Sequence, residues 1–202
     1  MVAAWVLNPT VEGRCEAAVS YLVTALPYDL SMMELFLDRL ESPIGTVVLI
    51  SDGEALRVLD FVDCEERMKR LLRVHYGTQA VVESRESLGI KWRVEAYFEG
   101  ELTSVDDIAV RTEGTAFQKE VWAELRRIPA STTVSYGELA KRVGRPNASR
   151  AVGLANGSNP VGIVVPCHRV IGANGALTGY GGGIERKRWL LKHEGAQLSL
   201  GA

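Results

Sequence analysis

The chain divides near residue 114 into two halves that differ in charge and in hydrophobic pattern. Residues 1–114 hold 11 Lys and Arg against 20 Asp and Glu, a net charge of −9, whereas residues 115–202 hold 12 against 5, a net charge of +7. Short apolar segments typical of strands fall in the acidic half, and apolar residues at helical spacing fall mainly in the basic half. This division predicts an α+β protein, and 202 residues are enough for two small domains with cores.

The acidic half carries the pattern of a small α+β domain. Strands are expected at 35–40, 46–50 and 56–61, because turn residues such as Gly45 and Asp52-Gly53 bound these apolar runs. Helices are expected at 65–76 and 87–98. The stretch that follows is irregular and acidic, as in a connection between domains. The expected boundaries are 33–100 for the N-terminal domain, 101–114 for the connection and 115–202 for the C-terminal domain.

Residues 1–32 precede these patterns as an N-terminal extension. Apolar residues recur at helical spacing from Glu16 to Leu26, before Pro27, which predicts one short helix. The sequence assigns no role to this extension.

The basic half contains two short helical segments separated by Gly144-Arg145-Pro146. Apolar residues lie at 136, 139, 140 and 143 in the first segment and at 148, 151, 152 and 155 in the second, which is the i, i+3, i+4, i+7 spacing of a helix. Asn147 is expected to cap the second helix, and a longer helix is expected at 117–128, before Pro129. This arrangement is the pattern of a helix-turn-helix, so DNA is the expected partner.

Positive charge in the basic half has two interpretations. A local basic surface attracts DNA phosphates whatever the net charge of the chain, and it supplies much of the affinity that does not depend on sequence. The same side chains could instead form an ordinary solvated face, which is the interpretation that charge alone favours. The residues concerned are Arg126, Arg127, Lys141, Arg142 and the cluster from Arg186 to Arg188.

Cys167 lies in the segment Val164-Val165-Pro166-Cys167-His168-Arg169-Val170. Pro166 fixes its own backbone angle and biases Val165 toward an extended conformation, so we expect Cys167 to emerge at the end of a strand. A thiol is a strong nucleophile only as the thiolate, which requires a nearby base or positive charge. The histidine and arginine that follow the thiol, and the carboxylate of Glu194, are candidates. Alternatively, Cys167 is a buried packing residue, as a lone cysteine usually is.

The three cysteines limit the cellular setting and the cofactors. Cys15, Cys64 and Cys167 form neither an even disulfide set nor a metal-binding spacing, and Cys64 with His75 does not complete a four-ligand set. We therefore expect free thiols in a reducing cytoplasmic compartment, and no metal. No uninterrupted apolar run approaches the roughly 18 residues of a membrane helix, and the start lacks the basic segment of a secretory signal. A soluble protein without a membrane segment is expected.

Four segments occur together in a specific order: Ser158-Asn159-Pro160, Ile163 to Gly172, Leu177-Thr178-Gly179-Tyr180, and Glu185 to Gly195. With the pentapeptide Pro166-Cys167-His168-Arg169-Val170, the chain resembles the O6-alkylguanine-DNA alkyltransferases over about residues 33–197, and most of all their bacterial, Ogt-like members. The resemblance implies a small N-terminal α/β domain of the ribonuclease-H-like type. It also implies a mainly helical C-terminal domain with a winged-helix-like helix-turn-helix and an active-site loop.

The resemblance implies a chemical role for five residues. Cys167 takes the alkyl carbon from guanine O6 and keeps it as a thioether, so that each molecule reacts once. His168 deprotonates Cys167 through a water, and Glu194 orients the imidazole. Tyr136 gives a proton to the departing purine, and Asn159 braces the helix-turn-helix against the cysteine segment. From pattern alone, Tyr136 could instead be a hydrophobic staple at the start of a helix, and Asn159 an ordinary turn residue.

Guanine O6 is paired inside the duplex, so the damaged base must be flipped out. By resemblance, Arg150 fills the vacated stack and Tyr136 helps to turn the nucleotide. The second helix offers small residues in place of polar readers of the major groove, which favours close approach in the minor groove. Ala148 and Ala151 could instead be simple packing residues. The expected DNA contacts are Ser135, Tyr136, Ala148, Ser149, Arg150 and Gly153.

The expected pocket residues are Val165, Pro166, Val170, Thr178, Tyr180 and Gly181. Backbone groups at Cys167, Val170 and Gly181 are expected to contact the extruded guanine, although the family often has serine at position 181. The glycine-rich run 175–183 is not a phosphate loop, because no Lys-Ser or Lys-Thr pair follows it. No cofactor is expected, since the damaged DNA carries the alkyl group. We expect a monomer in solution; cooperative DNA binding and the preference among adducts, including O4-alkylthymine, stay open.

Two alternatives belong to other functional classes. A noncatalytic alkyltransferase-like protein would bind damaged DNA with the same helix-turn-helix, but such relatives replace the cysteine, which is present at position 167. A thiol hydrolase using Cys167, His168 and Glu194 would leave the basic half and Arg150 unexplained, and hydrolysis would regenerate the enzyme.

Overall fold

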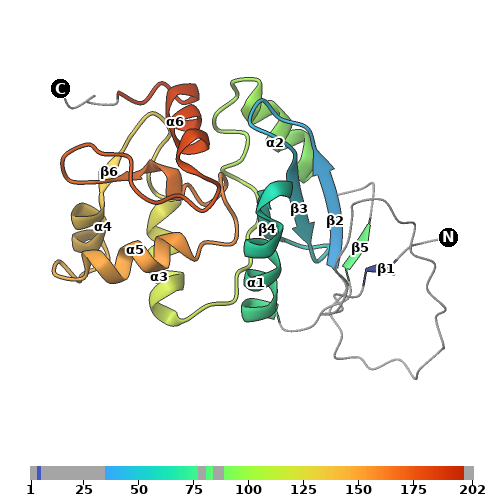
Figure 1. Ribbon diagram of the computed structural model, residues 1–202, viewed down its shortest axis with the longest axis horizontal. Helices are drawn as coiled ribbons and strands as arrows, with labels where there is room; N and C mark the ends of the chain where they lie inside the picture. Colours follow the sequence, from blue (N-terminus) through green and yellow to red (C-terminus); the bar gives the residue numbers. More distant parts are fainter. Residues whose placement is uncertain (1–3, 6–34, 77–80, 84–88, 198–202) are drawn as a thin grey trace.

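The computed structural model describes residues 4–5, 35–76, 81–83 and 89–197. The helix expected from Glu16 to Leu26 lies outside the described residues. A five-stranded sheet has the order β1-β5-β2-β3-β4 and lies with α1 and α2 on one side of Figure 1, while the helices of the C-terminal half lie on the other. The strands are β1 (Ala4–Trp5), β2 (Leu35–Leu40), β3 (Val47–Ser51), β4 (Leu56–Phe61) and β5 (Val81–Glu83).

The three strands expected from the sequence form the antiparallel meander β2-β3-β4. Two have the expected bounds, and β3 is displaced by one residue from the expected 46–50. All residues of β3 and β4 are buried, which explains why neither segment alternates between polar and apolar side chains. The sequence did not predict β1 and β5, which pair antiparallel with each other and add to β2 through a parallel β5–β2 pairing.

Two helices accompany the sheet. α1 (Glu65–Tyr76) has the expected bounds, and its buried side chains are those of Met68, Leu71, Leu72 and Tyr76. His75 is half-buried and packs its ring edge-on against Trp122 with centroids 5.7 Å apart, so it serves as a packing residue between the halves. α2 (Ile90–Phe98) begins after the expected start at residue 87, which lies outside the described residues.

Two segments from beyond residue 100 extend the sheet past β4. Leu56 donates its amide to Ala109 O at 2.8 Å, and Leu59 donates to Pro160 O at 3.0 Å. The return bonds run from Arg111 N to Leu56 O at 3.1 Å and from Gly162 N to Leu59 O at 2.9 Å. The expected interdomain connection is therefore held along β4, and so is the segment that leads to Cys167.

The C-terminal half contains α3 (Ala116–Leu125), β6 (Val134–Ser135), α4 (Tyr136–Arg142), α5 (Ser149–Gly157), β7 (Val170–Ile171) and α6 (Ile184–His193). Thr115 and Gln118 form a capping box at the start of α3. α4 and α5 are the two helices that the sequence predicted. The expected cap at Asn147 is wrong: Ala148 occupies the N-cap of α5 without a side-chain bond, because the turn closes through the backbone, from Ala148 N to Arg145 O at 2.9 Å.

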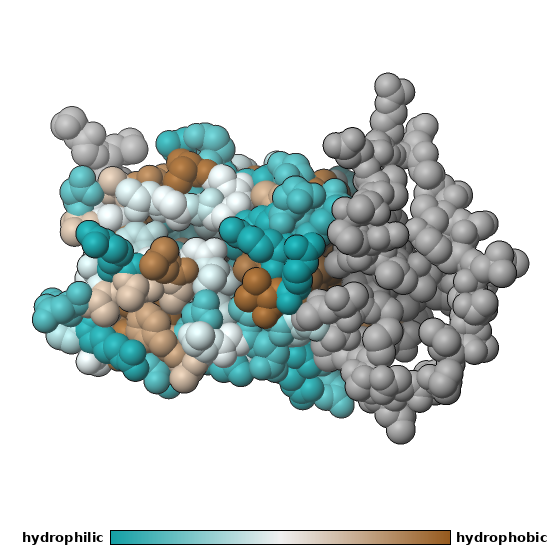
Figure 2. All heavy atoms as spheres, turned by 60° about the horizontal axis from the view of Figure 1, so that its bottom comes forward, coloured by the Kyte–Doolittle hydropathy of each residue, from teal (hydrophilic) through white to brown (hydrophobic). Residues whose placement is uncertain are grey.

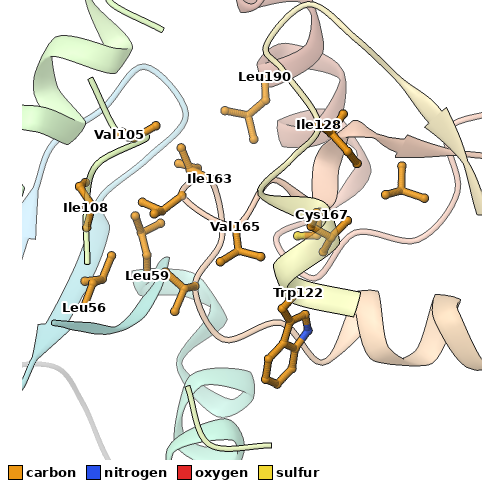
Figure 3. Close-up of a cluster of buried hydrophobic side chains, with 14 of the residues drawn as sticks. Leu56, Leu59, Val105, Ile108, Trp122, Ile128, Ile163, Val165, Cys167 and Leu190 are labelled. Carbon is orange, nitrogen blue, oxygen red and sulfur yellow. The ribbon is translucent and has the colours of Figure 1, made fainter. Parts of the chain in front are cut away.

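One hydrophobic cluster spans both halves. It joins Leu59 of β4 and Tyr97 of α2 to residues of the C-terminal half such as Leu125 and Leu190. Figure 3 shows Cys167 within this cluster, with Ile128, Val165 and Trp122. The side chains around Cys167 are therefore held by packing from both halves of the chain.

The surface of the described residues is mostly polar. Figure 2 shows small brown patches set among teal and white, rather than a continuous apolar face. The most exposed large apolar residues are Val74 of α1 and Leu154 of α5, at 71% and 74% exposed. No helix in the described part of the chain has the length and apolar character that a membrane crossing needs.

Candidate active site

Cys167 is 5% exposed and begins a short 3₁₀ helix, Cys167–Arg169. The expectation of a strand end is wrong, because the preceding residues turn sharply after they bond to β4. Val164 N bonds to Gly162 O at 2.7 Å, and Val165 N bonds to Val161 O at 3.0 Å. Ile163 has a φ of 66°, a region that β-branched residues rarely adopt. The thiol is thus fixed by a strained turn and not by an extended strand.

Two asparagines hold this turn. Asn159 is buried, its Nδ2 donates to Val165 O at 2.8 Å, and its Oδ1 accepts from Val161 N at 3.0 Å. Asn156 of α5 donates from Nδ2 to the Cys167 carbonyl at 3.3 Å. The bracing expected of Asn159 therefore involves a second residue that sequence reasoning missed. Its signal was a polar side chain in the buried stripe of α5, next to Ala155.

A buried cluster of charged and polar groups surrounds Glu194. His168 Nε2 lies 2.9 Å from Glu194 Oε1. Arg169 donates from Nε to Oε2 at 2.9 Å and from Nη2 to Oε1 at 2.7 Å. Tyr97, which sequence reasoning missed, donates its hydroxyl from α2 to Oε1 at 2.8 Å. The structure brings together the expected histidine and carboxylate and adds two donors that fix the carboxylate.

The charge state of this cluster follows from its contacts. Burial alone raises the pKa of Glu194, but the hydrogen bonds from His168 and Arg169 and the positive charge of Arg169 outweigh burial and hold the pKa far below its usual range. Burial lowers the pKa of His168, although Glu194 opposes this effect. A neutral imidazole facing an ionised carboxylate carries its proton on Nε2, so Nδ1 is an acceptor. Among the described residues, the buried Nδ1 of His168 has no hydrogen-bond partner.

The resting state of Cys167 is the thiol. Burial raises its pKa, while a hydrogen bond from the Asn159 side chain and the charges of Arg67 and Lys187 act in the opposite direction. Of the two aids expected for the thiol, positive charge alone does not bring its pKa down toward neutrality, because desolvation is the larger effect. Attack by Cys167 requires a base that removes the proton during the reaction.

Lys187 is buried in α6 and was not expected there. Its Nζ donates to Val170 O at 2.6 Å and to Thr178 O at 2.8 Å, and burial lowers its pKa to about 8. Arg186 is also part-buried and donates to Ile44 O at 2.8 Å and to Gly182 O at 2.9 Å. Of the basic cluster 186–188, only Arg188 fits the expected exposed face. The signal for Lys187 was its helical spacing with the buried Leu190 and Leu191.

Tyr136 lies at the start of α4, between α5 and the loop before α6. Its hydroxyl donates to Thr178 O at 3.3 Å, and a Cβ atom on Gly153 would lie 3.7 Å from its ring. β6 pairs with β7, through Val134 with Val170, and thereby places the start of α4 beside the cysteine segment. The Tyr136 ring therefore packs against Gly153 of α5, and its hydroxyl contacts the glycine-rich loop at Thr178.

The other expected DNA contacts are distributed over α4 and α5. Ser149 and Arg150 are exposed at the start of α5, and Ala148 is partly buried. Ala151 is exposed, so its interpretation as a packing residue is wrong. The hydroxyl of Ser135 accepts a bond from Glu138 N at 3.0 Å and caps α4.

A cavity adjoins Cys167 at the junction of the two halves. Tyr180 and Gly181 line it as expected, whereas Val165, Pro166 and Val170 are buried nearby without lining it and Thr178 is exposed. Sequence reasoning missed the contribution of the acidic half. The lining residues are Leu59, Asp60, Phe61, Arg67, Asn159, Gly162, Cys167, Tyr180, Gly181 and Gly182.

The Tyr97 hydroxyl offers a test of the buried cluster. Tyr97→Phe should lower the free energy of unfolding by about 1.5 kcal/mol, because it removes one bond to a buried carboxylate. It should also slow the alkyl transfer that the resemblance implies, because Glu194 is the side chain that contacts His168 Nε2. Tyr76→Phe is the matched control: it removes bonds to two neutral carbonyl oxygens, at 3.1 Å each, and should affect stability alone. Urea unfolding and single-turnover kinetics measure the two effects; equal transfer rates in both variants would contradict the role of Tyr97.

Comparisons with known proteins agree with this geometry. Residues 116–196 match the family described as 6-O-methylguanine DNA methyltransferase, DNA binding domain. The methylated-DNA–protein-cysteine methyltransferase of Shigella flexneri is 46% identical over 170 residues, covering 83% of this chain and 99% of the relative. The protein of the same name from Methanosarcina acetivorans is 50% identical over 157 residues, covering 77% of this chain and 96% of the relative.

Solved structures give the same result. The structure of Mycobacterium tuberculosis OGT in complex with DNA has a TM-score of 0.68 and 44% identity, and covers 80% of this chain and 92% of that one. The O6-methylguanine-DNA methyltransferase of Pyrococcus kodakaraensis has a TM-score of 0.58 and 25% identity, and covers 80% of this chain and 99% of that one. The resemblance drawn from the motifs is confirmed, and the chain belongs to the methylated-DNA–protein-cysteine methyltransferase family.

Proposed function

We propose that this protein repairs DNA by moving an alkyl group from guanine O6 to the sulfur of Cys167, once per molecule. The observation that carries the proposal is the arrangement around the thiol. A buried cysteine is fixed by two asparagines and lies one residue before a neutral histidine, whose Nδ1 has no partner within the described part of the chain and can accept a proton. A base held in this way supplies the thiolate that burial disfavours at rest.

The transfer step balances without a cofactor. His168 Nδ1 takes the thiol proton through a water, and Glu194 stabilises the resulting imidazolium. The sulfur lone pair forms a bond to the alkyl carbon as the bond from that carbon to O6 breaks, and the released electron pair goes to the purine. Tyr136 gives a proton to the purine, which leaves as neutral guanine. The thioether has no leaving step, so Cys167 is not regenerated.

DNA binding is assigned to α4 and α5. The small residues at the start of α5 allow the backbone to approach the minor groove, and the exposed Arg150 fills the space of the flipped base. The basic half supplies phosphate contacts. We infer that the substrate is double-stranded DNA carrying O6-alkylguanine, with O4-methylthymine as a second substrate. We further infer that the protein acts as a monomer in the reducing cytoplasm, where thiols such as those of Cys64 and Cys167 stay free.

Arg150→Ala should weaken binding to a duplex containing O6-methylguanine by about 1–3 kcal/mol, since the side chain no longer replaces the stacked base. Fluorescence of 2-aminopurine next to the lesion measures base extrusion, and anisotropy measures affinity. Arg188→Ala is the control, because it removes an equal charge from an exposed site on α6. If both variants lost the same amount of affinity and base extrusion, Arg150 would be only a general phosphate contact and not the residue that replaces the flipped base.

The function is tested by incubating the protein with a duplex that carries radiolabelled O6-methylguanine. One methyl group per protein molecule should move to the protein and remain in the peptide that contains Cys167. Binding without transfer would support the noncatalytic alternative. Repeated turnover with an unmodified protein would support a hydrolase. Transfer in excess of the protein would also exclude the single-use mechanism.

A further inference from the structure

An ion pair from the acidic half, between Asp60 and Arg67, lines one side of the cavity beside Cys167. Arg67 of α1 donates from Nη1 to Asp60 Oδ2 of β4. The Asp60 side chain is 4% exposed, and its other oxygen accepts from Phe61 N at 3.0 Å. Both residues line the same cavity as the thiol. The pair is thus a structural part of the cavity and not a surface contact.

Arg67 also reaches the C-terminal half on two sides of the cavity. Its Nη2 donates to Asn159 O at 2.9 Å and to Gly157 O at 3.3 Å. The guanidinium lies against the backbone of Gly181, where a Cβ atom would overlap it. One side chain therefore connects the α5–cysteine turn, the glycine-rich loop and β4.

The space that these walls leave is small. The cavity has a volume of about 10 Å³, which is room for about one water molecule. Most of the other lining groups are glycine backbone or tightly packed aromatic rings. The rings of Tyr180 and Phe61 pack so closely on Gly182 that a Cβ atom there would lie 2.9 Å and 3.0 Å from them. Among the described lining residues, Arg67 has the longest flexible side chain, and at 18% exposed it can swing toward solvent.

We propose that the Asp60–Arg67 pair is a specificity-determining element that sets the size of the alkyl group that Cys167 accepts. A methyl group fits with the pair in place. A group as large as benzyl reaches the sulfur only when Arg67 swings out, which breaks its bonds to Asp60 and Asn159 O and leaves the buried Asp60 without its partner. This inference rests on the proposed function, because it concerns which adducts the same thiol accepts.

The test compares single-turnover transfer rates from O6-benzylguanine and O6-methylguanine placed in the same duplex. Arg67→Ala should raise the benzyl-to-methyl rate ratio about tenfold over that of the unchanged protein, which corresponds to about 1.4 kcal/mol of activation free energy. Arg70→Ala is the matched control. Arg70 lies three residues further along α1, has the same charge and is exposed, so its removal should leave both rates unchanged.

A second variant guards against misfolding. Arg67→Ala alone leaves a buried carboxylate without a partner, which is strongly destabilising. The double variant Asp60→Asn, Arg67→Ala removes both charges and should show the same rise in the rate ratio. Urea unfolding of each variant establishes that the comparison is made on folded protein. A ratio unchanged in the double variant overturns the proposal, as does a parallel fall of both rates, which would make Arg67 a general support of the chemistry.

The failure of this inference is distinguishable from the failure of the proposed function. If the unchanged protein transfers no methyl group, the proposed function is wrong. If it transfers one methyl group per molecule and the ratio does not respond to the variants, the function stands and the Asp60–Arg67 pair is only a structural link between the halves.

Discussion

Cys167→Ala should abolish alkyl transfer to the protein while duplex binding persists, since the residue supplies the accepting atom and lies outside α4 and α5. Cys167→Ser should fail as well, because a buried hydroxyl is a far weaker nucleophile than a thiolate. Intact-mass measurement after incubation with an O6-methylguanine duplex should show the mass of one added methyl group on the unchanged protein and none on either variant.

Cys64→Ala is the control for this result. Cys64 is the other free cysteine among the described residues, and burial raises the pKa of its thiol. Its Sγ lies 3.8 Å from Gly181 O, close to the active-site loop, but Cys64 is not followed by a histidine and lacks the asparagine contacts of Cys167. The Cys64 variant should still take up one methyl group. A methyl group found on Cys64 or Cys15 of the Cys167 variant would refute the assignment of the acceptor.

Glu194→Ala should cost about 3–5 kcal/mol of folding free energy, because it leaves the buried Arg169 without its counter-charge. This loss is a large fraction of the 5–15 kcal/mol that holds a typical domain together. Transfer should be lost too, since His168 loses the carboxylate that fixes its proton on Nε2. Glu185→Ala on the same helix removes an exposed partner of Arg188 and should cost less than about 1 kcal/mol. Similar urea midpoints for the two variants would show that Glu194 does not stabilise the fold as the buried counter-charge of Arg169.

The variant Glu194→Gln allows the stabilisation from the Glu194 carboxylate to be measured as a function of pH. The pKa of Glu194 is lower in the folded protein than in the unfolded chain, so the unfolded chain binds the proton more readily. The stabilisation from the carboxylate is therefore fully present above the unfolded pKa of about 4.3 and is lost as the pH falls below it. The difference in unfolding free energy between the unchanged protein and this variant should be largest near neutral pH and should shrink in acid. A difference that grows in acid would contradict the sign of the shift.

Local pattern was sufficient for much of the fold. The strands β2, β3 and β4 and the helices α1, α4 and α5 all follow from turn residues and apolar spacing within a few residues. The turn before Cys167 does not, because its shape depends on the bonds that tie Pro160 and Gly162 to Leu59, about a hundred residues earlier. Pro166 favoured an extended segment locally, and this long-range pairing overrode that preference.

The candidate site shows the same limit. The motif around Cys167 identified the thiol, the histidine and Glu194, which are separated by fewer than 30 residues. Two of the residues that sequence reasoning missed, Arg67 and Tyr97, come from the acidic half and contact Asn159 and Glu194 across 92 and 97 residues. No spacing rule connects positions so far apart, and a polar residue in an otherwise apolar pattern was the only available sign.

The bonds between β4 and the segment that leads to Cys167 also concern the behaviour of the molecule in concentrated solution. β4 is the last strand of the sheet, and residues 109–111 and 160–162 occupy the backbone groups that it would otherwise present at its outer side. Without these two segments, the backbone groups of β4 would be unpaired, and an unpaired edge strand is a template for pairing with other chains. Any event that breaks the bonds between Leu59 and the cysteine segment therefore exposes part of the β4 edge to pairing with another molecule. Damage to the reactive turn and self-association of the protein thus have a common structural origin.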